Sequence, residues 1–415
     1  MELKVLSPLY GGMSLARDDK VFFVKGAIPD ETVDAQIIEK KRDYYITRAT
    51  SIIEPSPYRQ SPPCPVFGLC GGCHYQHIAY EKQLSMKQEI LCDCLRRIGK
   101  FDEVNLEKAI HGDQFNYRYR AQFKIQNGRI GFFMENSHEV VEFKKCLLLD
   151  PVLNNTLEIL KHIDIPPGIT EITLTAGDEI IAYIPSGNVS RDFLLSMIEK
   201  QVVSGVIAGN GESAGIKSTE FRLGALRYTV SAQSFFQSNW ALNDRLSDLI
   251  AEILGPQQTL NGDKRDTDIA RPAKYGSLLD IYGGAGNFSL PISNMFKKVT
   301  VIEENPFSIE DGIRNAELDG VQNMHFIQST AEEIKVRGKF DVIIIDPPRI
   351  GLTAQIMKKL MELAPEQLLY ISCNPATLSR DAAKLRDMYN LDYIRLIDMF
   401  PQTFHCEIFC RFRLK

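Results

Sequence analysis

The first part of the chain shows the short alternation of apolar and polar residues that is typical of β-strands. Residues 21–24 form an apolar run that ends before the turn residues Gly26 and Pro29, and residues 32–39 alternate as a half-buried strand does. Short strands separated by turns predict a small β-barrel over residues 1–56. Five prolines between positions 55 and 65 then exclude a helix or a central strand, so we place the first domain boundary there.

The middle of the chain combines one helical pattern with many short strands. Residues 79–99 have helical periodicity, and residues 115–230 return to strands and turns. We therefore expect a β-rich central domain over residues 57–230. The polar and charged stretch 262–276 has no periodicity, which predicts an exposed insertion.

The last part of the chain has the rhythm of an α/β domain. Apolar runs of strand length, separated by stretches of helical length, begin at residues 277, 299, 340 and 367. Buried strands that alternate with helices predict a mostly parallel, Rossmann-like sheet with helices on both faces. We assign this domain to residues 231–415 and expect its ligands at the carboxyl ends of the strands.

Length and composition are those of a globular protein. The 415 residues are too many for one core, which predicts two or three domains, and the formal net charge is -5. No apolar run is long enough to cross a bilayer and the acidic start lacks a secretory signal, so we expect a cytoplasmic protein without membrane segments. Basic stretches at 39–42 and 117–120 keep RNA binding open despite the net charge.

A glycine-rich loop follows the first strand of the α/β part, in the segment Asp280-Ile-Tyr-Gly-Gly-Ala-Gly-Asn-Phe288. Its glycines let the backbone approach a ligand, and Tyr282 and Asn287 are candidate cofactor contacts. Glu303 ends the next strand, where it can accept both hydroxyls of a ribose. A dinucleotide-binding loop, or a tight turn that binds no ligand, would have the same pattern of glycines, so both alternatives remain open at this point. The next motif favours S-adenosylmethionine.

Asp346 ends a strand and is followed by two prolines and Arg349. The prolines fix a stiff turn that projects the Asp346 carboxylate into the crevice. Similar Asp-Pro-Pro turns, with an aromatic residue in place of Arg349, hold the target amine of many N-methyltransferases. N-methylation through Asp346 and a rigid turn without chemistry both remain open here.

Cys373 lies at the end of another strand, just before a helix that begins near Pro375. A helix N-terminus favours a thiolate, and a strand end beside Asn-Pro is a poor place for a packing cysteine, so we interpret Cys373 as a nucleophile. Thiolate addition at C6 of uracil makes C5 nucleophilic enough to take a methyl group. The C5 proton must then leave, and His405 and Glu407 are candidate bases.

At these segments the chain resembles the RNA (uracil-C5) methyltransferases, and the resemblance runs from residue 1 to 415. Residues 372–378 are similar to the nucleophile motif of that family and residues 400–407 to its base motif, which implies the nucleophile Cys373 and the base Glu407. The family also implies a class I methyltransferase domain with a seven-stranded sheet. The cofactor or target-base contacts that it implies are Gln237, Tyr282, Glu303 and Asp346.

The sequence departs from the family pattern at three places. Gly283 stands where many members have a cysteine, which should matter little. Residues 328–330 lack the Asp or Asn often found there, so the sequence does not assign the residue near Ser329 and Thr330 that contacts adenine. The stretch 262–276 has no counterpart.

Four cysteines form a candidate metal site: Cys64, Cys70, Cys73 and Cys146. Four thiolates suit a tetrahedral site, and their spacing alone permits zinc or an iron–sulfur cluster. The resemblance implies a [4Fe–4S] cluster, because family members with the Cys-Gly-Gly-Cys pattern carry one. Cys92 and Cys94, two apart on a predicted helix, are interpreted as packing residues.

The N-terminal barrel resembles the TRAM module, an RNA-binding unit. Residues 116–124 interleave aromatic and cationic side chains as an RNA-binding surface does, although a strand with a cationic edge has the same pattern. We expect a monomer that flips a uridine of RNA into its pocket. The resemblance favours 23S rRNA, with uridine 54 of tRNA as the alternative; an N-methyltransferase and a non-enzymatic RNA chaperone are less favoured.

Overall fold

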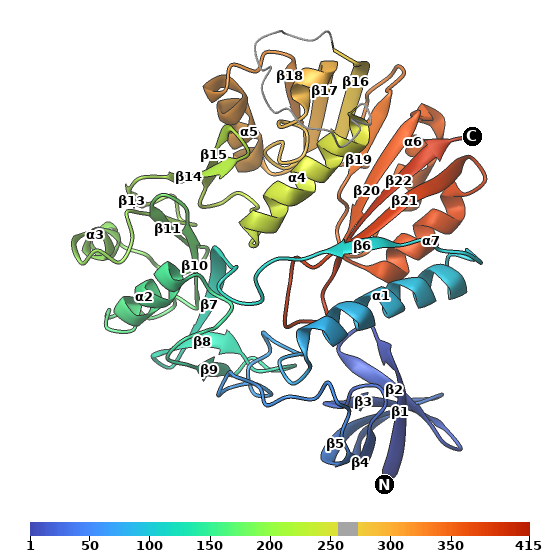
Figure 1. Cartoon of the computed structure of the whole chain (residues 1–415). Helices are drawn as coiled ribbons and strands as arrows, with labels where there is room; N and C mark the ends of the chain where they lie inside the picture. The colour runs from blue at the N-terminus through green and yellow to red at the C-terminus, as the bar shows by residue number, and fades with distance from the viewer. Residues whose placement is uncertain (256–272) are drawn as a thin grey trace, which may run out of the picture.

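The N-terminal residues fold into a closed barrel at one end of the molecule (Figure 1). The computed structural model describes residues 1–255 and 273–415. Leu3, Val24 and Val33 are buried inside the barrel, because successive side chains of a strand point to opposite faces. The strands, hydrogen-bonded in the order β1-β2-β3-β5-β4, are β1 (Glu2–Leu9), β2 (Met13–Arg17), β3 (Val21–Lys25), β4 (Thr32–Lys40) and β5 (Tyr45–Glu54).

A seven-stranded mixed sheet of order β13-β12-β11-β10-β7-β8-β9 forms the centre of the chain. Leu153 and Leu157 of one helix and Leu194 of another are buried in the core of this sheet. Its elements are β7 (Arg120–Gln126), β8 (Arg129–Phe133), β9 (Val140–Glu142), α2 (Pro151–Leu160), β10 (Glu171–Ala176), β11 (Ile180–Ile184), α3 (Arg191–Glu199), β12 (Gly205–Ala208) and β13 (Ser213–Gly215). A separate hairpin, β14 (Ser218–Leu223) and β15 (Leu226–Ser231), follows.

The remaining sheet has eight strands in the order β18-β17-β16-β19-β20-β22-β21-β6. Its central pairs are parallel, and β22 is antiparallel to both of its neighbours. The elements that follow the hairpin are α4 (Trp240–Leu254), β16 (Tyr275–Ile281), η1 (Ser293–Met295), β17 (Phe296–Glu303), α5 (Pro306–Leu318), β18 (Met324–Gln328), β19 (Val342–Ile345), α6 (Ala354–Leu363), β20 (Gln367–Ser372), α7 (Pro375–Leu385), β21 (Tyr389–Ile397) and β22 (Glu407–Leu414).

The eighth strand departs from the expectation of seven. It is β6 (Glu107–Ile110), which comes from the segment expected in the central domain and pairs in parallel with β21. The helix before it, α1 (Tyr80–Arg97), buries Leu91 and Leu95 in the core of the same sheet. Residues of the central segment therefore complete the C-terminal sheet, a pairing across a long stretch of chain that local periodicity does not reveal.

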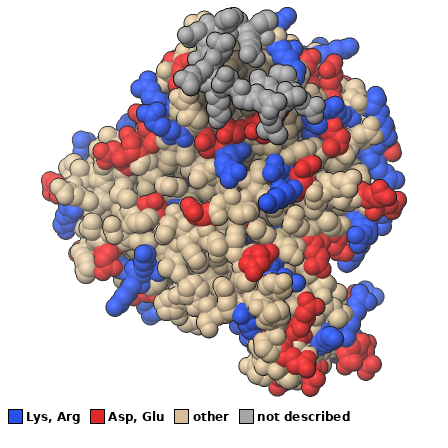
Figure 2. All heavy atoms as spheres, in the orientation of Figure 1, with Lys and Arg blue, Asp and Glu red and all other residues tan. Residues whose placement is uncertain are grey.

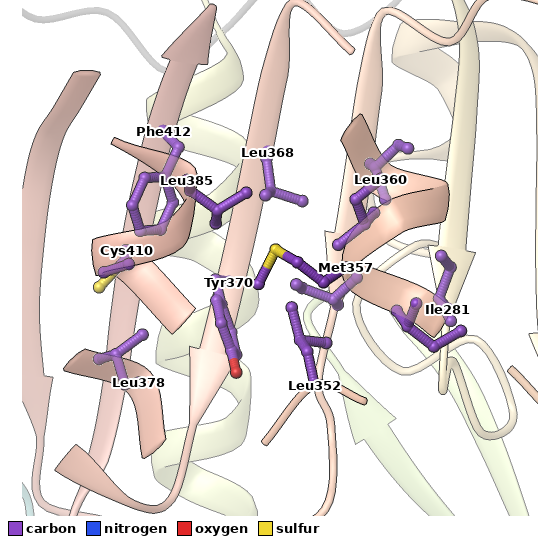
Figure 3. Close-up of a cluster of buried hydrophobic side chains, with 14 of the residues drawn as sticks. Ile281, Leu352, Met357, Leu360, Leu368, Tyr370, Leu378, Leu385, Cys410 and Phe412 are labelled. Carbon is purple, nitrogen blue, oxygen red and sulfur yellow. The ribbon is translucent and has the colours of Figure 1, made fainter. Parts of the chain in front are cut away.

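Helices cover both faces of the eight-stranded sheet. Figure 3 shows Leu360 of α6 and Leu385 of α7 beside Leu368 and Phe412 of the strands, in the core that α1 also joins. On the other face, residues of α4 such as Leu246 pack against the sheet. Burial on both faces explains the continuous apolar runs in the sequence.

The end of the polar stretch 262–276 is part of a strand. Tyr275 and Gly276 do not belong to an exposed insertion but begin β16; the part of that stretch up to residue 272 lies outside the described residues. Within the described residues, no helix is long and apolar enough to span a bilayer.

Candidate active site

The ends of the strands bring the candidate catalytic residues to one edge of the eight-stranded sheet. Asp280 is the last residue but one of β16, and Glu303 is the last residue of β17. Asp346 follows β19 and Cys373 follows β20. Glu407 begins β22, which is antiparallel to β20, so the start of β22 lies at the same edge.

One cavity of about 660 Å³ opens at this edge. The catalytic and cofactor residues singled out from the sequence all line it: Gln237, Tyr282, Asn287, Glu303, Asp346, Cys373 and Glu407. Phe235 also lines the cavity and is 68% exposed, so an aromatic face is available at the rim. Phe235 was not among the residues singled out from the sequence, although the aromatic pair directly before Gln237 was a usable signal.

The glycine-rich loop is held against the next strand by Glu303. The Glu303 carboxylate accepts a hydrogen bond from the Gly284 amide at 3.1 Å and one from the Asn305 amide at 2.8 Å. Gly284 has φ +55°, in the left-handed region that favours glycine. Tyr282 lies in the same region, with φ +64°. The loop is thus shaped to bring backbone groups into the cavity.

The Asn287 side chain forms hydrogen bonds within the protein. Its side-chain amide exchanges two hydrogen bonds with Asn243 of α4, at 2.8 and 2.7 Å. Asn287 therefore ties the glycine-rich loop to α4 even though it lines the cavity. Ser329, near the open adenine contact, also lines the cavity, and its hydroxyl donates to the Thr330 carbonyl at 3.0 Å.

The structure corrects the expected state of Cys373. Burial, followed by the nearby carboxyls of Glu407 and Asp346, raises the pKa of the Cys373 thiol to about 11, and Arg349 offsets only part of this shift. The thiol is therefore protonated at neutral pH, because desolvation and negative neighbours outweigh the helix N-terminus expected to favour a thiolate.

The first turn of α7 has its own cap. The Asn374 side chain accepts from the amides of Ala376 and Thr377, at 3.0 and 3.4 Å, so these helix donors are already partnered. The Asn374 side-chain amide also donates to the Arg349 carbonyl at 3.1 Å. The Cys373 loop and the Asp346-Pro-Pro-Arg turn are thereby linked.

Three buried carboxyls near the cavity hold protons more tightly than usual. Burial raises the pKa of Asp280 and of Asp346 to about 7, and the mutual repulsion of the two carboxyls adds to the shift of Asp346. Burial and then Asp346 raise the pKa of Glu407 well above its ordinary value. One oxygen of Glu407, Oε1, is buried without a hydrogen-bond partner among the described residues.

The two candidate bases have opposite properties. Burial, followed by Arg349, lowers the pKa of His405 to about 3, which makes its imidazole a poor proton acceptor at neutral pH. The raised pKa of Glu407 means that its carboxylate, once ionised, is a stronger base than an exposed glutamate. The electrostatics favour Glu407.

The loop before Glu407 is fastened from several parts of the chain. Lys87 of α1 forms an ion pair with Asp398 at 2.5 Å and donates to the Phe400 carbonyl at 3.1 Å. Gln83, one turn earlier on α1, exchanges hydrogen bonds with Gln402.

Further bonds reach this loop from outside α1. The Tyr117 hydroxyl donates to the Pro401 carbonyl at 3.0 Å, and the Asn239 side chain donates to the Met399 carbonyl at 3.0 Å. None of these anchors was among the residues singled out from the sequence. Two polar residues one turn apart on the buried face of α1, Gln83 and Lys87, were the available signal.

The four candidate metal-binding cysteines line a second cavity, of about 960 Å³. Burial raises the pKa of Cys73 to about 12 and raises those of Cys70 and Cys146 as well. Across residues 1–255 and 273–415, no three His, Cys, Asp or Glu side chains are placed to hold a single metal ion. Cys92 and Cys94 are half-buried on α1, away from this cavity.

The two cavities share part of their walls. Arg118, Arg349 and His405 line both of them. The Arg118 guanidinium lies 5.9 Å from the centre of the Phe400 ring, within reach of a cation–π contact. Two cations therefore lie between the cysteine cavity and the candidate active site.

Part of the segment expected to face RNA is used internally. Tyr117 is buried, and the Arg120 guanidinium donates to the backbone carbonyls of Ala232 and Ser234. On the face of the molecule in Figure 2, acidic and basic side chains are mixed around the margin and few cover the middle. Arg118 is the residue of this segment that reaches the cavities.

Comparison with known proteins fits this arrangement. The model of the tRNA (Uracil-5-)-methyltransferase family matches residues 224–412. An RNA methyltransferase of Aquifex aeolicus is 34% identical over 98% of this chain and 97% of its own. The 23S rRNA (uracil(1939)-C(5))-methyltransferase RlmD of Mannheimia succiniciproducens is 32% identical over 98% of this chain and 94% of its own.

The fold is also found among solved structures. The tRNA (uracil-54, C5)-methyltransferase of Pyrococcus abyssi, solved in complex with S-adenosyl-L-homocysteine, has a TM-score of 0.75 and 23% identity and covers 99% of this chain and 100% of its own. The full-length sequence relatives decide the assignment. The chain belongs to the RNA (uracil-C5) methyltransferase family and is an RNA methyltransferase.

Proposed function

We propose that this enzyme transfers a methyl group from S-adenosylmethionine to C5 of a uridine in 23S rRNA, through a covalent bond between Cys373 and C6. The observation that carries the proposal is that Cys373 and Glu407 line the same cavity as the glycine-rich loop. A nucleophile, a base and a cofactor loop are the parts that this chemistry needs.

The cofactor side of the cavity offers groups of the right kind. Glu303 suits the ribose hydroxyls, and the backbone of the glycine-rich loop allows close approach of the cofactor. Tyr282, Gln237 and Asp346 complete the lining at the point where cofactor and target base would meet. Bound S-adenosylmethionine supplies an electrophilic methyl group there.

Proton movement follows from the pKa values. Cys373 must lose its proton before it attacks C6, and Asp346 can accept that proton, because it lines the same cavity and its pKa, raised to about 7, leaves much of it ionised at neutral pH. The attack produces an enolate whose C5 takes the methyl group. Glu407 then removes the C5 proton, the C5–C6 double bond reforms, and the Cys373 thiolate leaves.

We assign the four cysteines to a [4Fe–4S] cluster. Cys64, Cys70, Cys73 and Cys146 surround one cavity, and a cluster takes one thiolate per iron, whereas zinc needs four donors around a single ion. The cluster would fasten the loop of Cys73, whose neighbours His74 and Tyr75 both donate backbone hydrogen bonds to the Gln402 carbonyl. An anaerobic preparation that contains zinc and no iron would overturn this assignment.

We assign RNA binding to the barrel of residues 1–56 together with the rim of the active site. The barrel carries a stacked aromatic pair, Phe23 and Tyr44, and the Lys20 ammonium lies 5.0 Å from the centre of the Tyr45 ring. These rings are half-buried, and rings and cations of this kind stack on bases and neutralise phosphates. The exposed ring of Phe235 at the cavity rim suits a flipped uridine.

The experiment is methyl transfer to RNA from a strain that lacks the modification. The protein is incubated with labelled S-adenosylmethionine and total RNA, and labelled nucleosides are mapped by nuclease digestion and mass spectrometry. We expect 5-methyluridine in 23S rRNA; label in tRNA instead would select the tRNA alternative. Label on a base nitrogen that survives Cys373→Ala would replace the proposal by N-methylation through Asp346.

A further inference from the structure

A side chain at the edge of the barrel forms a hydrogen bond with the backbone of the candidate nucleophile. Tyr10 lies in the turn between β1 and β2, and its hydroxyl donates a hydrogen bond to the backbone carbonyl of Cys373 at 3.0 Å. The two residues are 363 positions apart. Burial raises the pKa of Tyr10, so the hydroxyl keeps its proton and remains a donor throughout the physiological pH range.

The same ring contacts the loop that carries the candidate base. The Tyr10 ring meets the Phe404 ring edge to face, with centroids 5.4 Å apart and planes at 85°. Phe404 precedes Glu407 by three positions and packs closely on His405, with ring centroids 4.1 Å apart. One barrel residue thus contacts the loops of both proposed catalytic groups.

The turn that carries Tyr10 is pressed against this loop. Gly12 has φ +81, and a Cβ added to it would lie 3.2 Å from Cδ1 of Phe404 and 3.4 Å from Cβ of His74. A larger residue at position 12 would therefore be strained and would push the turn away from Phe404. The close fit means that the position of Tyr10 depends on docking of the barrel.

The backbone carbonyl of Cys373 has no hydrogen-bond partner within the β-sheet. Ser372 is the last residue of β20 that pairs with β22, so the Cys373 carbonyl lies beyond the end of the ladder. Asn374 is held through its own side chain by Arg349 and the first turn of α7. The N–H of the peptide between these two residues donates to the Ser372 hydroxyl at 3.3 Å, and its carbonyl accepts from the Tyr10 hydroxyl, so Tyr10 holds the carbonyl side of this peptide.

We propose that Tyr10 is a positioning residue for methyl transfer: it orients the Cys373 peptide, and thereby the thiol, when the barrel is docked on the catalytic sheet. The inference rests on the proposed role of Cys373 as the nucleophile. Small displacements of a reacting group lower the rate of attack strongly, so the hydroxyl acts on the rate of adduct formation rather than on substrate affinity. Recognition of RNA by the barrel would then be coupled to the geometry of attack.

The test compares Tyr10→Phe with the wild-type enzyme in the formation of the covalent adduct. The probe is the RNA in which methylation is mapped, transcribed with 5-fluorouridine; fluorine at C5 leaves no proton for the base to remove, so the adduct accumulates. The matched control is Tyr275→Phe, which removes a hydroxyl that donates to the Leu254 carbonyl at 2.9 Å, at the start of β16 and outside both cavities.

The expected result is a single-turnover adduct rate lower by about fivefold to tenfold in Tyr10→Phe, the effect of losing one hydrogen bond at a reacting group. KM for RNA and for S-adenosylmethionine and the thermal unfolding midpoint should match those of Tyr275→Phe. 4-Aminophenylalanine at position 10 puts an N–H donor in place of the hydroxyl and should restore most of the rate, which also decides the question if Tyr10→Phe folds poorly.

Each other outcome has a definite meaning. An adduct rate equal to that of Tyr275→Phe would overturn the inference, and so would a raised KM for RNA with an unchanged rate, because Tyr10 would then act in binding alone. Failure of 4-aminophenylalanine to restore the rate would overturn it as well. If the wild-type enzyme forms no adduct, the proposed function fails instead, and the two failures are distinguishable.

Discussion

Lys87 of α1 and Asp398, the residue after β21, form an ion pair in which both side chains have no exposed surface. The pair joins a helix from the first quarter of the chain to the loop that ends in Glu407. The Tyr80 hydroxyl donates to the second oxygen of Asp398 at 2.8 Å, which satisfies the carboxylate further. A fully buried ion pair is costly to break, because water cannot solvate the charge that remains when its partner is removed.

Replacement of Lys87 by methionine should destabilise the enzyme by about 3–5 kcal/mol, because it leaves the Asp398 carboxylate buried without its cation. The measurement is urea unfolding followed by tryptophan fluorescence and circular dichroism. Lys82→Met on the same helix is the control, since Lys82 lies 3.7 Å from an exposed Asp30 and should cost about 1 kcal/mol or less. Equal effects of the two variants would contradict the role given to the pair.

The proposed roles of Cys373 and Glu407 predict two different failures. Cys373→Ala should form neither adduct nor product. Glu407→Gln should transfer the methyl group to C5 of the bound uridine and then retain the RNA as a covalent adduct, because the amide cannot remove the C5 proton. Denaturing gel electrophoresis with labelled RNA distinguishes the two variants. Normal turnover by Glu407→Gln would refute the assignment of the base.

The raised pKa of Asp280 predicts a specific dependence of stability on pH. A carboxyl whose pKa is about 7 in the folded state and about 4 in the unfolded state binds its proton more tightly when folded, so its contribution to stability is lost as the pH rises from 4 to 7. Asp280→Asn removes this group. The variant should therefore lose less stability between pH 5 and pH 8 than the wild type, by about 2–3 kcal/mol.

Urea unfolding at the two pH values measures this difference. Asp102→Asn, at an exposed position of the described chain, is the control and should follow the wild type. A pH dependence of Asp280→Asn that equals that of the wild type would show that the carboxyl is not the source of the effect.

The cluster assignment predicts that Cys146→Ser loses iron. A thiolate contributed from far along the chain closes the site, and serine is a poor ligand for iron–sulfur clusters. Iron and acid-labile sulfide should fall in Cys146→Ser and stay at the wild-type level in Cys92→Ser, whose side chain lies on α1. Full iron content in Cys146→Ser would show that another group completes the site.

Much of the catalytic edge could be predicted from the sequence, because it depends on local patterns. Apolar runs mark β16, β17, β19 and β20, and a residue at the end of a buried parallel strand reaches the same edge wherever the run lies in the chain. The barrel could be predicted for the same reason, since alternation with period two is visible in each strand. The family motifs then named Cys373 and Glu407.

The contacts that hold the site could not be predicted, because they join distant segments. Nothing near Glu107 indicates that β6 pairs with β21, and nothing near Tyr10 indicates a bond to Cys373. The prediction of a thiolate at Cys373 was wrong, because a helix N-terminus is visible in the sequence whereas burial beside Glu407 and Asp346 is not. Desolvation is a property of the assembled site.

The pairing of β6 with β21 also bears on how the protein is made. Arg395 of β21 donates to the Lys108 carbonyl of β6, 287 residues earlier in the chain. During synthesis on a ribosome, α1 and β6 emerge long before the strand and the loop that they meet, so the apolar face of α1 stays without its partners while most of the polypeptide is still being added. A nascent chain released early would expose that face, which makes premature termination a route to aggregation rather than to a smaller working enzyme.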